Sequence, residues 1–190
     1  MEKISKISQG FCFLAAAGIL ISCGCSTAPK NGEALDVLAA EVDQAVAIFK
    51  SKDPEIQRFF DNSYGYAVFP KVYKGAFWVG GAFGRGEVYE QNRMIGYSSL
   101  SQATLGFSFG GQYFREIIFF RDQSHFKEFI MGEYTFAAQV TGVALTEGAA
   151  AKTDYQDGKA VFVIAESGLM VDASIGGQKF EFSPLSVVRE

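Results

Sequence analysis

Cysteine is nearly missing from this sequence, and histidine occurs once. The cysteines are Cys12, Cys23 and Cys25, and the rest of the chain contains none. Disulfide bonds therefore cannot stabilise the part of the chain after Cys25, which must be stabilised by the packing of its core. A structural zinc site needs several thiolate or imidazole ligands, which His125 alone cannot supply. We expect no bound metal and no cofactor.

An excess of positive charge is also lacking. The 190 residues carry 17 Lys and Arg against 21 Asp and Glu, a formal net charge of −4. Binding to nucleic acid depends largely on cations at the phosphates, so a nucleic-acid partner is disfavoured. Apolar residues make up 48% of the chain, including 19 Phe and 8 Tyr. This supply is sufficient for the core of one domain.

Long apolar runs are confined to the first residues. Lys3 and Lys6 precede an uncharged run over 11–21, and a small residue, Ser22, follows. A basic start, an apolar run and a small-residue cleavage site are typical of a secretory signal. The run is too short to cross a bilayer, which needs about 20 apolar residues. Residues 1–22 are therefore predicted to be a signal peptide.

The predicted cleavage site resembles a bacterial lipobox. It reads Leu20-Ile21-Ser22-Cys23, and Cys23 is the expected site of lipid attachment. Several acyl chains anchor a protein firmly in a membrane, because each buried methylene contributes about 0.8 kcal/mol to the free energy of membrane binding. Cys25 as acceptor, or a plain secreted protein, are the alternatives. Residues 23–32 would be the acylated N-terminus and tether. In lipoproteins of bacteria with two membranes, an aspartate after the acylated cysteine retains the protein in the inner membrane. Here Gly24 follows Cys23, so the resemblance implies the outer membrane if the source has two membranes.

The remaining residues, 33–190, divide into a helical start and a β-rich remainder. An amphipathic helix is expected over 33–50, a second short helix from Pro54 to Phe60, and one mid-chain helix over 124–131. Runs that alternate aromatic or β-branched residues with small ones predict strands, at 64–69, 76–83, 87–90, 104–109, 116–121, 138–145, 160–165, 169–175 and 179–182. Asp157-Gly158 and Gly176-Gly177 are expected hairpin turns. The fold class is α+β, with a curved antiparallel sheet or barrel.

A G-x-S-x-G motif at 106–110 raises the alternative of a serine esterase. Ser108 would be the nucleophile, with Asp122 and His125 completing a triad. That chemistry requires the serine on a tight strand-to-helix turn. The residues after Gly110 favour a strand instead, so Ser108 is interpreted as an ordinary strand residue. We expect the protein not to be an enzyme.

A glycine-rich segment at 80–86 invites comparison with phosphate-binding loops. Such loops open a helix and usually end in Gly-Lys-Ser or Gly-Lys-Thr, and neither feature is present here. The alternation of Phe77, Val79 and Phe83 favours a strand. Nucleotide binding is therefore not expected at this segment.

One basic and aromatic stretch does suggest a binding site. Lys71, Lys74 and Arg85 lie close in sequence to Phe77, Trp78 and Phe83, in an otherwise acidic chain. Cations beside amphipathic aromatics suit the headgroup region of a membrane. The alternative is a solvated loop edge beside a core tryptophan. These six residues are the candidate lipid-binding residues.

The segment Gly65–Gly86, GYAVFPKVYKGAFWVGGAFGRG, resembles the signature of the SYLF domain family. GFSFGGQ at 106–112 and IIFF at 117–120 are similar to its second block, and the likeness extends from about residue 35 to residue 182. The resemblance implies a non-catalytic lipid-binding module of the kind found in exported bacterial lipoproteins. Eukaryotic members bind phosphoinositides, and yeast members also bind actin.

The predicted helical region departs from the eukaryotic pattern of that family. Acidic residues outnumber basic ones between residues 33 and 61, and an acidic helix is repelled by anionic lipid. Lys74 is the residue that carries over from the family's block as a headgroup contact. We therefore expect an envelope-anchored protein that binds lipid, including anionic phospholipid, or the membrane surface. A structural lipoprotein that docks an envelope protein is the alternative, and an esterase the third.

Overall fold

The computed structural model describes residues 32–76, 79–105, 112–132, 135–136, 143–144, 146–165 and 175–185 of the chain. The predictions made for the signal peptide, for Cys23 and the tether up to residue 31, and for Phe77, Trp78 and Ser108 lie outside these residues.

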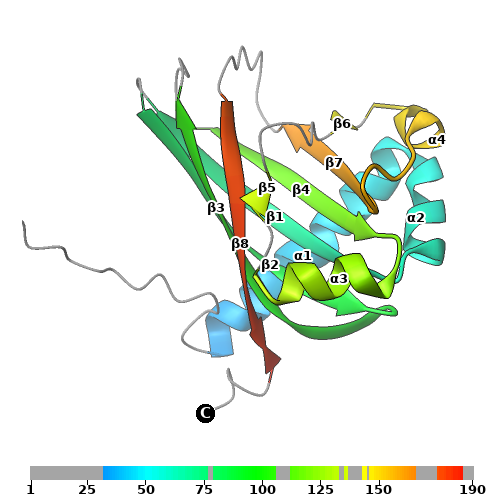
Figure 1. The fold of residues 1–190 in the computed structure, drawn as a ribbon, viewed down its shortest axis with the longest axis horizontal. Helices are drawn as coiled ribbons and strands as arrows, with labels where there is room; N and C mark the ends of the chain where they lie inside the picture. Colours follow the sequence, from blue (N-terminus) through cyan, green and yellow to red (C-terminus); the bar gives the residue numbers. More distant parts are fainter. Residues whose placement is uncertain are drawn as a thin grey trace, which may run out of the picture.

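One curved sheet dominates the fold (Figure 1). Its strand order is β5-β8-β3-β2-β1-β4-β7-β6. Six long strands pair antiparallel in its centre: β1 (Gly65–Ala76), β2 (Val79–Glu90), β3 (Arg93–Leu105), β4 (Gln112–Phe120), β7 (Lys159–Ala165) and β8 (Ile175–Pro184). Two short strands, β5 (Thr135–Phe136) and β6 (Val143–Ala144), flank them. The predicted class, α+β with a curved antiparallel sheet, is confirmed.

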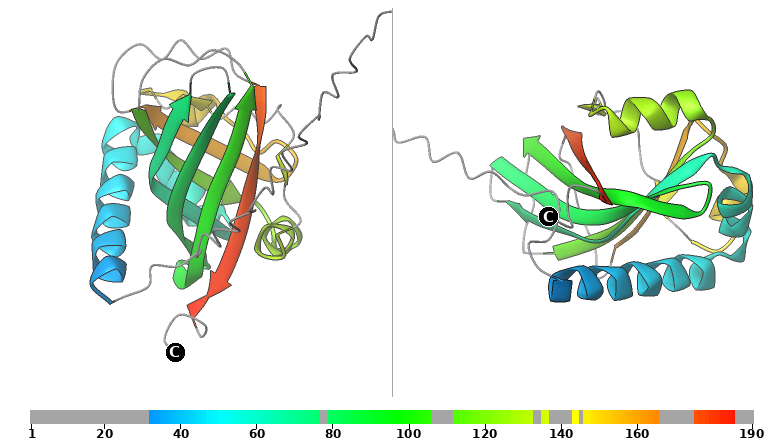
Figure 2. Two further views of the ribbon diagram at one scale, coloured as in Figure 1. Left: turned by 90° about the vertical axis from the view of Figure 1, so that its left-hand side faces the viewer. Right: turned by 90° about the horizontal axis from the view of Figure 1, so that it is seen from below.

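The first helix, α1 (Gly32–Lys52), lies along one face of this sheet (Figure 2). Its buried residues Leu38, Val42, Ala45 and Phe49 recur at helical spacing, as the sequence pattern predicts. Glu33 lies in its first turn and Lys50 and Lys52 in its last, which suits the helix dipole. The predicted amphipathic helix is confirmed, with one further residue at its N-terminal end and two at its C-terminal end.

The second helical segment begins at a buried cap. The Asp53 carboxylate accepts a hydrogen bond from the Glu55 amide at 3.1 Å, and Pro54 opens the 3-10 turn η1 (Pro54–Ile56) that leads into α2 (Gln57–Asn62). The same carboxylate accepts from the Ala150 amide at 2.7 Å. Asp53 thereby docks α4 (Ala149–Lys152), a short helix that the sequence did not predict.

The sheet has an apolar core on each face. The outer face, covered by α1 and α2, buries Tyr66, Val68, Ile117, Phe119 and Phe162. The inner, concave face buries the residues between them in sequence, including Ala67, Phe69, Val72, Phe114, Ile118, Phe120 and Phe180. This alternation follows from the two-residue period of a strand. The strands are therefore sandwiched between two layers of side chains.

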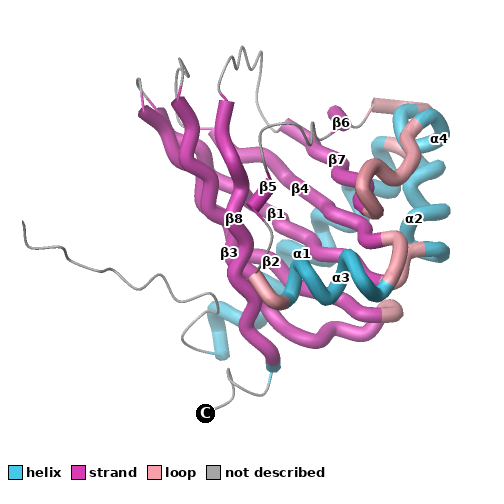
Figure 3. Tube along the Cα trace, viewed as in Figure 1, coloured by secondary structure: helices cyan, strands magenta, loops and turns pink. Residues whose placement is uncertain are grey.

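Helix α3 (Gln123–Ile130) lies on the inner side, opposite α1 (Figures 2 and 3). Its Phe129 ring packs 4.8 Å from the Phe120 ring of β4 and 5.3 Å from the Phe180 ring of β8. One aromatic side chain thus bridges two strands that are four places apart in the sheet order. The predicted mid-chain helix is confirmed, and it begins and ends one residue earlier than expected.

A bulge in β1 changes which residues face α1. The pairing register shifts between Val68 and Lys71 against β2, and between Phe69 and Val72 against β4. Pro70 sits within this bulge, the usual place for a proline in a central strand because it cannot donate to the ladder. The extra residue puts Val72 on the inner face and turns Lys71 toward α1.

Two of the sequence expectations about turns and strands are wrong. Gly176-Gly177 is not a hairpin turn but part of β8, paired with Thr104 and Ala103 of β3. The expected single strand over 76–83 instead falls on two strands, because Ala76 ends β1 and residues 79–83 begin β2. Aromatic and glycine alternation alone does not show where one strand ends and the next begins. The Asp157-Gly158 turn is confirmed, with paired Gln156–Lys159 backbone bonds of 2.8 and 3.0 Å.

Candidate functional site

A groove lies between the N-terminal half of α1 and the outer face of β1 and β2. It has a volume of about 200 Å³. The helix contributes Ala34, Val37, Leu38 and Glu41, and the strands contribute Pro70, Lys71, Tyr73, Phe83, Gly84 and Arg85. Three of the six predicted lipid-binding residues, Lys71, Phe83 and Arg85, therefore meet in one groove.

The floor of the groove is built from two cross-strand pairs. Lys71 is directly opposite Arg85, and Tyr73 is directly opposite Phe83. Cross-strand partners project from the same face of a sheet, so this floor places two basic side chains beside two aromatic ones. It resembles a built anion site with an apolar flank.

Both cations of the floor have contacts that hold them in place. The Lys71 ammonium donates to the Glu41 carboxylate of α1 at 2.6 Å, and this bond raises the pKa of Lys71 above its ordinary value. The Arg85 guanidinium lies 5.5 Å from the centre of the Phe83 ring, within the range of a cation–π contact. The groove carries two cations and one carboxylate among its described residues.

Exposed apolar side chains border the groove. Val37 of α1 is 53% exposed and Tyr73 of β1 is 60% exposed, and these are two of the three large hydrophobic residues exposed in the described part of the chain. The Tyr73 ring also lies 5.9 Å from the Tyr113 ring of β4. Apolar and amphipathic side chains beside cations can enter the interface of a bilayer while the cations meet headgroups.

Lys74 lies on the other face of the sheet. It pairs with Ala82 of β2, which belongs to the inner core, and has the same orientation as Val72. Its side chain is buried, and burial lowers the pKa of Lys74. Lys71 and Lys74 are three residues apart in a regularly paired stretch of β1, so strand alternation places them on opposite faces. The sequence-predicted patch is therefore divided between two faces.

A buried carboxylate lies deeper beneath α1. Glu87 of β2 accepts a hydrogen bond from the Tyr89 hydroxyl at 2.6 Å, and the Tyr89 ring stacks on Tyr66 at 4.8 Å. Burial raises the pKa of the Glu87 carboxyl, and the hydroxyl bond opposes this shift. Burial is also the main cause that raises the pKa of Tyr89. This cluster fixes the strands under the helix rather than lining the groove.

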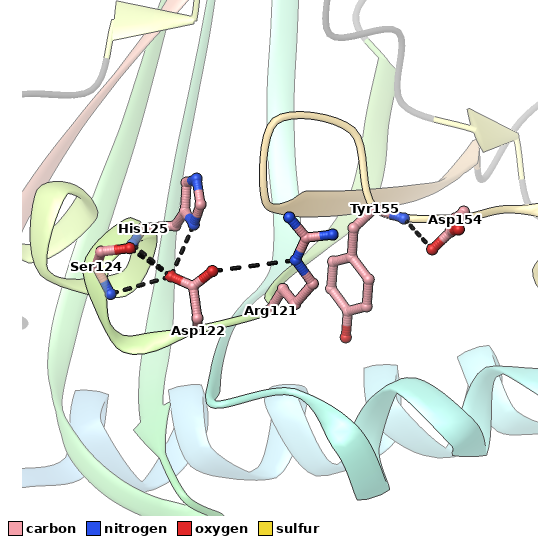
Figure 4. A network of polar contacts seen from close by, with 6 residues as sticks. All are labelled: Arg121, Asp122, Ser124, His125, Asp154 and Tyr155. Carbon is pink, nitrogen blue, oxygen red and sulfur yellow. Dashed lines mark hydrogen bonds and ion pairs between the residues drawn. The ribbon is translucent and has the colours of Figure 1, made fainter.

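Of the alternative esterase triad, the structure describes Asp122 and His125, whereas Ser108 lies outside the described residues. The Ser124 hydroxyl donates to the Asp122 carboxylate at 2.6 Å, and His125 Nδ1 lies 2.8 Å from the same oxygen (Figure 4). Asp122 also accepts from the Ser124 and His125 amides, which caps α3. These bonds hold the pKa of Asp122 well below its usual range. Here the aspartate accepts the hydrogen bond of the Ser124 hydroxyl, whereas nucleophilic catalysis needs a serine bonded to the histidine.

Sequence reasoning missed Glu41, Val37 and Tyr73 as groove residues. The helical pattern places Glu41 beside a buried stripe, but no spacing in the sequence links it to a strand thirty residues later. The described helices include none that is long and apolar enough to cross a bilayer. Over the same described ranges, no three histidine, cysteine or acidic residues are grouped as metal ligands would be.

Comparison with known proteins gives one relative of note. The protein named beta cell expansion factor A, from Aeromonas veronii, is 31% identical over 156 residues. The match covers 80% of this chain and 59% of the relative, so the chain spans less than two thirds of that protein's length. No family model matches the chain. The chain is thus similar to a longer protein from Aeromonas.

Proposed function

We propose that this protein binds the surface of anionic membranes through the groove between α1 and strands β1 and β2, without catalysing a reaction. The observation that supports this most is the pairing of Lys71 with Arg85 beside Tyr73 and Phe83. Cations attract anionic headgroups, at about 1 kcal/mol for each basic residue near the surface. The exposed Val37 and Tyr73 supply the apolar contact.

The size of the groove favours a headgroup as the ligand. Pockets that enclose a drug-sized molecule usually have volumes of about 300–1,000 Å³. The groove holds about 200 Å³, which suits a headgroup or a short part of one chain. We therefore expect docking on a bilayer rather than extraction of a whole lipid.

The predicted anchor would bring this groove close to a membrane. The chain from residue 24 to residue 32 spans at most about 30 Å when fully extended. Ala34, Val37 and Glu41 of the first helical turns line the groove. If Cys23 carries acyl chains, the groove stays within reach of the bilayer surface. Anchor and groove would then act together, as two weak membrane signals often do.

Vesicle co-sedimentation tests the proposal. Residues 26–190 retain every described helix and strand and lack the predicted acylation site, so this fragment reports the groove alone. We expect it to bind vesicles of phosphatidylglycerol and phosphatidylcholine more tightly than vesicles of phosphatidylcholine only. Binding should weaken with salt, because the screening length falls to about 8 Å at physiological ionic strength. The double substitution Lys71→Ala with Arg85→Ala should weaken vesicle binding by about 2 kcal/mol.

A matched pair of substitutions controls for net charge. Lys127 of α3 and Lys152 of α4 are exposed and lie outside the groove, so Lys127→Ala with Lys152→Ala removes the same charge elsewhere. This control should bind nearly as well as the unchanged fragment. Equal losses for the two double variants would show general attraction only and would contradict the proposal.

The Aeromonas relative suggests a second candidate function. That protein is named for the expansion of beta cells, and the similarity covers 80% of this chain. Adding the 26–190 fragment to cultured beta cells and counting them tests whether this chain acts similarly. No increase over a heat-denatured sample would reject this candidate without affecting the first.

A further inference from the structure

The groove contains a carboxylate at the place where an anionic ligand is expected. Glu41 is the one acidic residue among the described residues that line it, and its oxygen lies 2.6 Å from the Lys71 ammonium. An ammonium donates hydrogen bonds to carboxylate and phosphate oxygens alike. Glu41 and a phosphate group would therefore compete for the same donor.

The ion pair is open enough to exchange. The side chains of Lys71 and Glu41 are 32% and 29% exposed, so solvent and ligand can reach both. Partly exposed pairs of this kind contribute little to folding stability. Separating them would leave α1 attached, since Leu38, Val42, Ala45 and Phe49 remain buried against the sheet.

We propose that Glu41 is an internal competitor that occupies Lys71 until the phosphate of an anionic membrane lipid replaces it. This inference rests on the proposed function and names its ligand chemistry, a phosphate headgroup in a bilayer. The exchange trades one anion for another on Lys71, and Arg85 lines the same groove. Glu41 would thereby lower the affinity of the groove, so that a given occupancy requires a higher density of anionic lipid.

The test compares two neutralising substitutions on the same helix. Glu41→Gln removes the competitor and keeps the size of the side chain. Glu33→Gln removes an equal charge from the first turn of α1 and lies outside the groove lining. In the 26–190 fragment, Glu41→Gln should bind phosphatidylglycerol vesicles about fivefold more tightly than Glu33→Gln, the attraction of one lysine near an anionic surface.

A double-mutant cycle assigns this gain to Lys71. With Lys71→Ala already present, Glu41→Gln and Glu33→Gln should give equal gains, because no lysine remains to be released. Equal gains in the presence of Lys71 would overturn the competitor role. If Arg85→Ala and Lys71→Ala also leave binding unchanged, the proposed function fails with it. If those two variants lose binding, only the role of Glu41 fails.

A competition experiment separates lipid phosphate from free phosphate. Inorganic phosphate, added at an ionic strength matched with chloride, should not displace the fragment from vesicles more than chloride does, because it offers nothing to Val37 and Tyr73. Selective displacement by phosphate would assign the groove to a soluble anion and overturn the membrane-lipid ligand.

Discussion

Glu116 of β4 accepts a hydrogen bond from the Gln178 amide of β8 at 3.0 Å, although β1, β2 and β3 lie between these strands in the sheet. The bond crosses the inner face and shows how strongly the sheet curves. Glu116 is 1% exposed, and its second oxygen has no hydrogen-bond partner. Burial raises the pKa of Glu116 to about 7.

This buried carboxyl should make stability depend on pH. An unfolded glutamate has a pKa of about 4.5, so the folded protein holds the proton more tightly. Stability from this group is fully present below pH 4.5 and is lost as pH rises through about 7. The difference corresponds to about 3 kcal/mol, at about 1.4 kcal/mol for each pKa unit. Urea unfolding of Glu116→Gln should show a gain of that order at pH 8 and little change at pH 4.

Glu181 provides the control for this prediction. It lies on β8, is exposed, and pairs with Lys179 at 2.8 Å. Glu181→Gln should change stability by less than about 0.5 kcal/mol at either pH, as surface substitutions usually do. A Glu116→Gln variant that is less stable than the unchanged protein at pH 8 would show that the carboxylate is well solvated or paired.

Gly86 should be essential to the bulge that orients Lys71. It lies on β2 opposite the bulge, and a Cβ there would overlap the carbonyl oxygen of Val68. Gly86→Ala should therefore destabilise the fold by about 2 kcal/mol, a typical cost of overpacking. Gly81, on the same strand, has room for a Cβ at 3.4 Å from the nearest atom, so Gly81→Ala should be nearly neutral. Thermal unfolding of both variants checks this, and equal melting temperatures would refute it.

Asp122 should act as a cap rather than as a catalytic acid. Asp122→Ala removes two backbone hydrogen bonds at the start of α3 and should cost about 1 kcal/mol, whereas Asp122→Asn should cost less. Because its folded pKa is depressed, the stability it contributes is present above its unfolded pKa and is lost as pH falls toward the folded one. Urea unfolding at pH 7 and pH 3 checks both statements. A larger loss for Asp122→Ala at pH 3 than at pH 7 would contradict them.

The same residues allow a test against catalysis. Ser108→Ala, Ser124→Ala and His125→Gln should each leave any hydrolysis of short acyl esters unchanged. Ser124 donates to Asp122 and not to His125, so no base is placed to activate it. A more than tenfold loss of ester hydrolysis in one of these variants, with folding intact, would support the esterase hypothesis.

Acylation at Cys23 remains a prediction from the sequence. Replacing Cys23 with serine should stop metabolic labelling with palmitate in a bacterial host that processes lipoproteins. Labelling that persists until Cys25 is also replaced would show that the modified residue was assigned wrongly.

Sequence reasoning recovered the elements with strong periodicity. The stripe of Leu38, Val42 and Phe49 identified α1, and the capping pair Asp53-Pro54 identified the second helix. The pairing register of the strands could not be predicted from the sequence. Pro70 indicates an irregularity in β1, but only the pairing with two neighbours shows that the bulge turns Lys71 toward α1 and Val72 to the inner face.

The groove could be predicted only in part for the same reason. Lys71, Phe83 and Arg85 stand out as basic and aromatic residues on neighbouring strand segments. Glu41 and Val37 come from a helix whose position over the sheet depends on the packed outer core. Gln178 and Glu116 are 62 residues apart in the sequence, and no local sequence pattern predicts their contact across the curved sheet.

The most direct test of the central claim asks which surface touches the membrane. The 26–190 fragment contains no cysteine, so one dye can be attached at a single introduced site. Tyr73→Cys places it at the groove, and Met131→Cys places it at an exposed position, 67% accessible, beyond the end of α3. With phosphatidylglycerol vesicles, we expect an environment-sensitive dye to shift to the blue at position 73 and to stay unchanged at position 131. A shift at 131 without one at 73 would contradict the account.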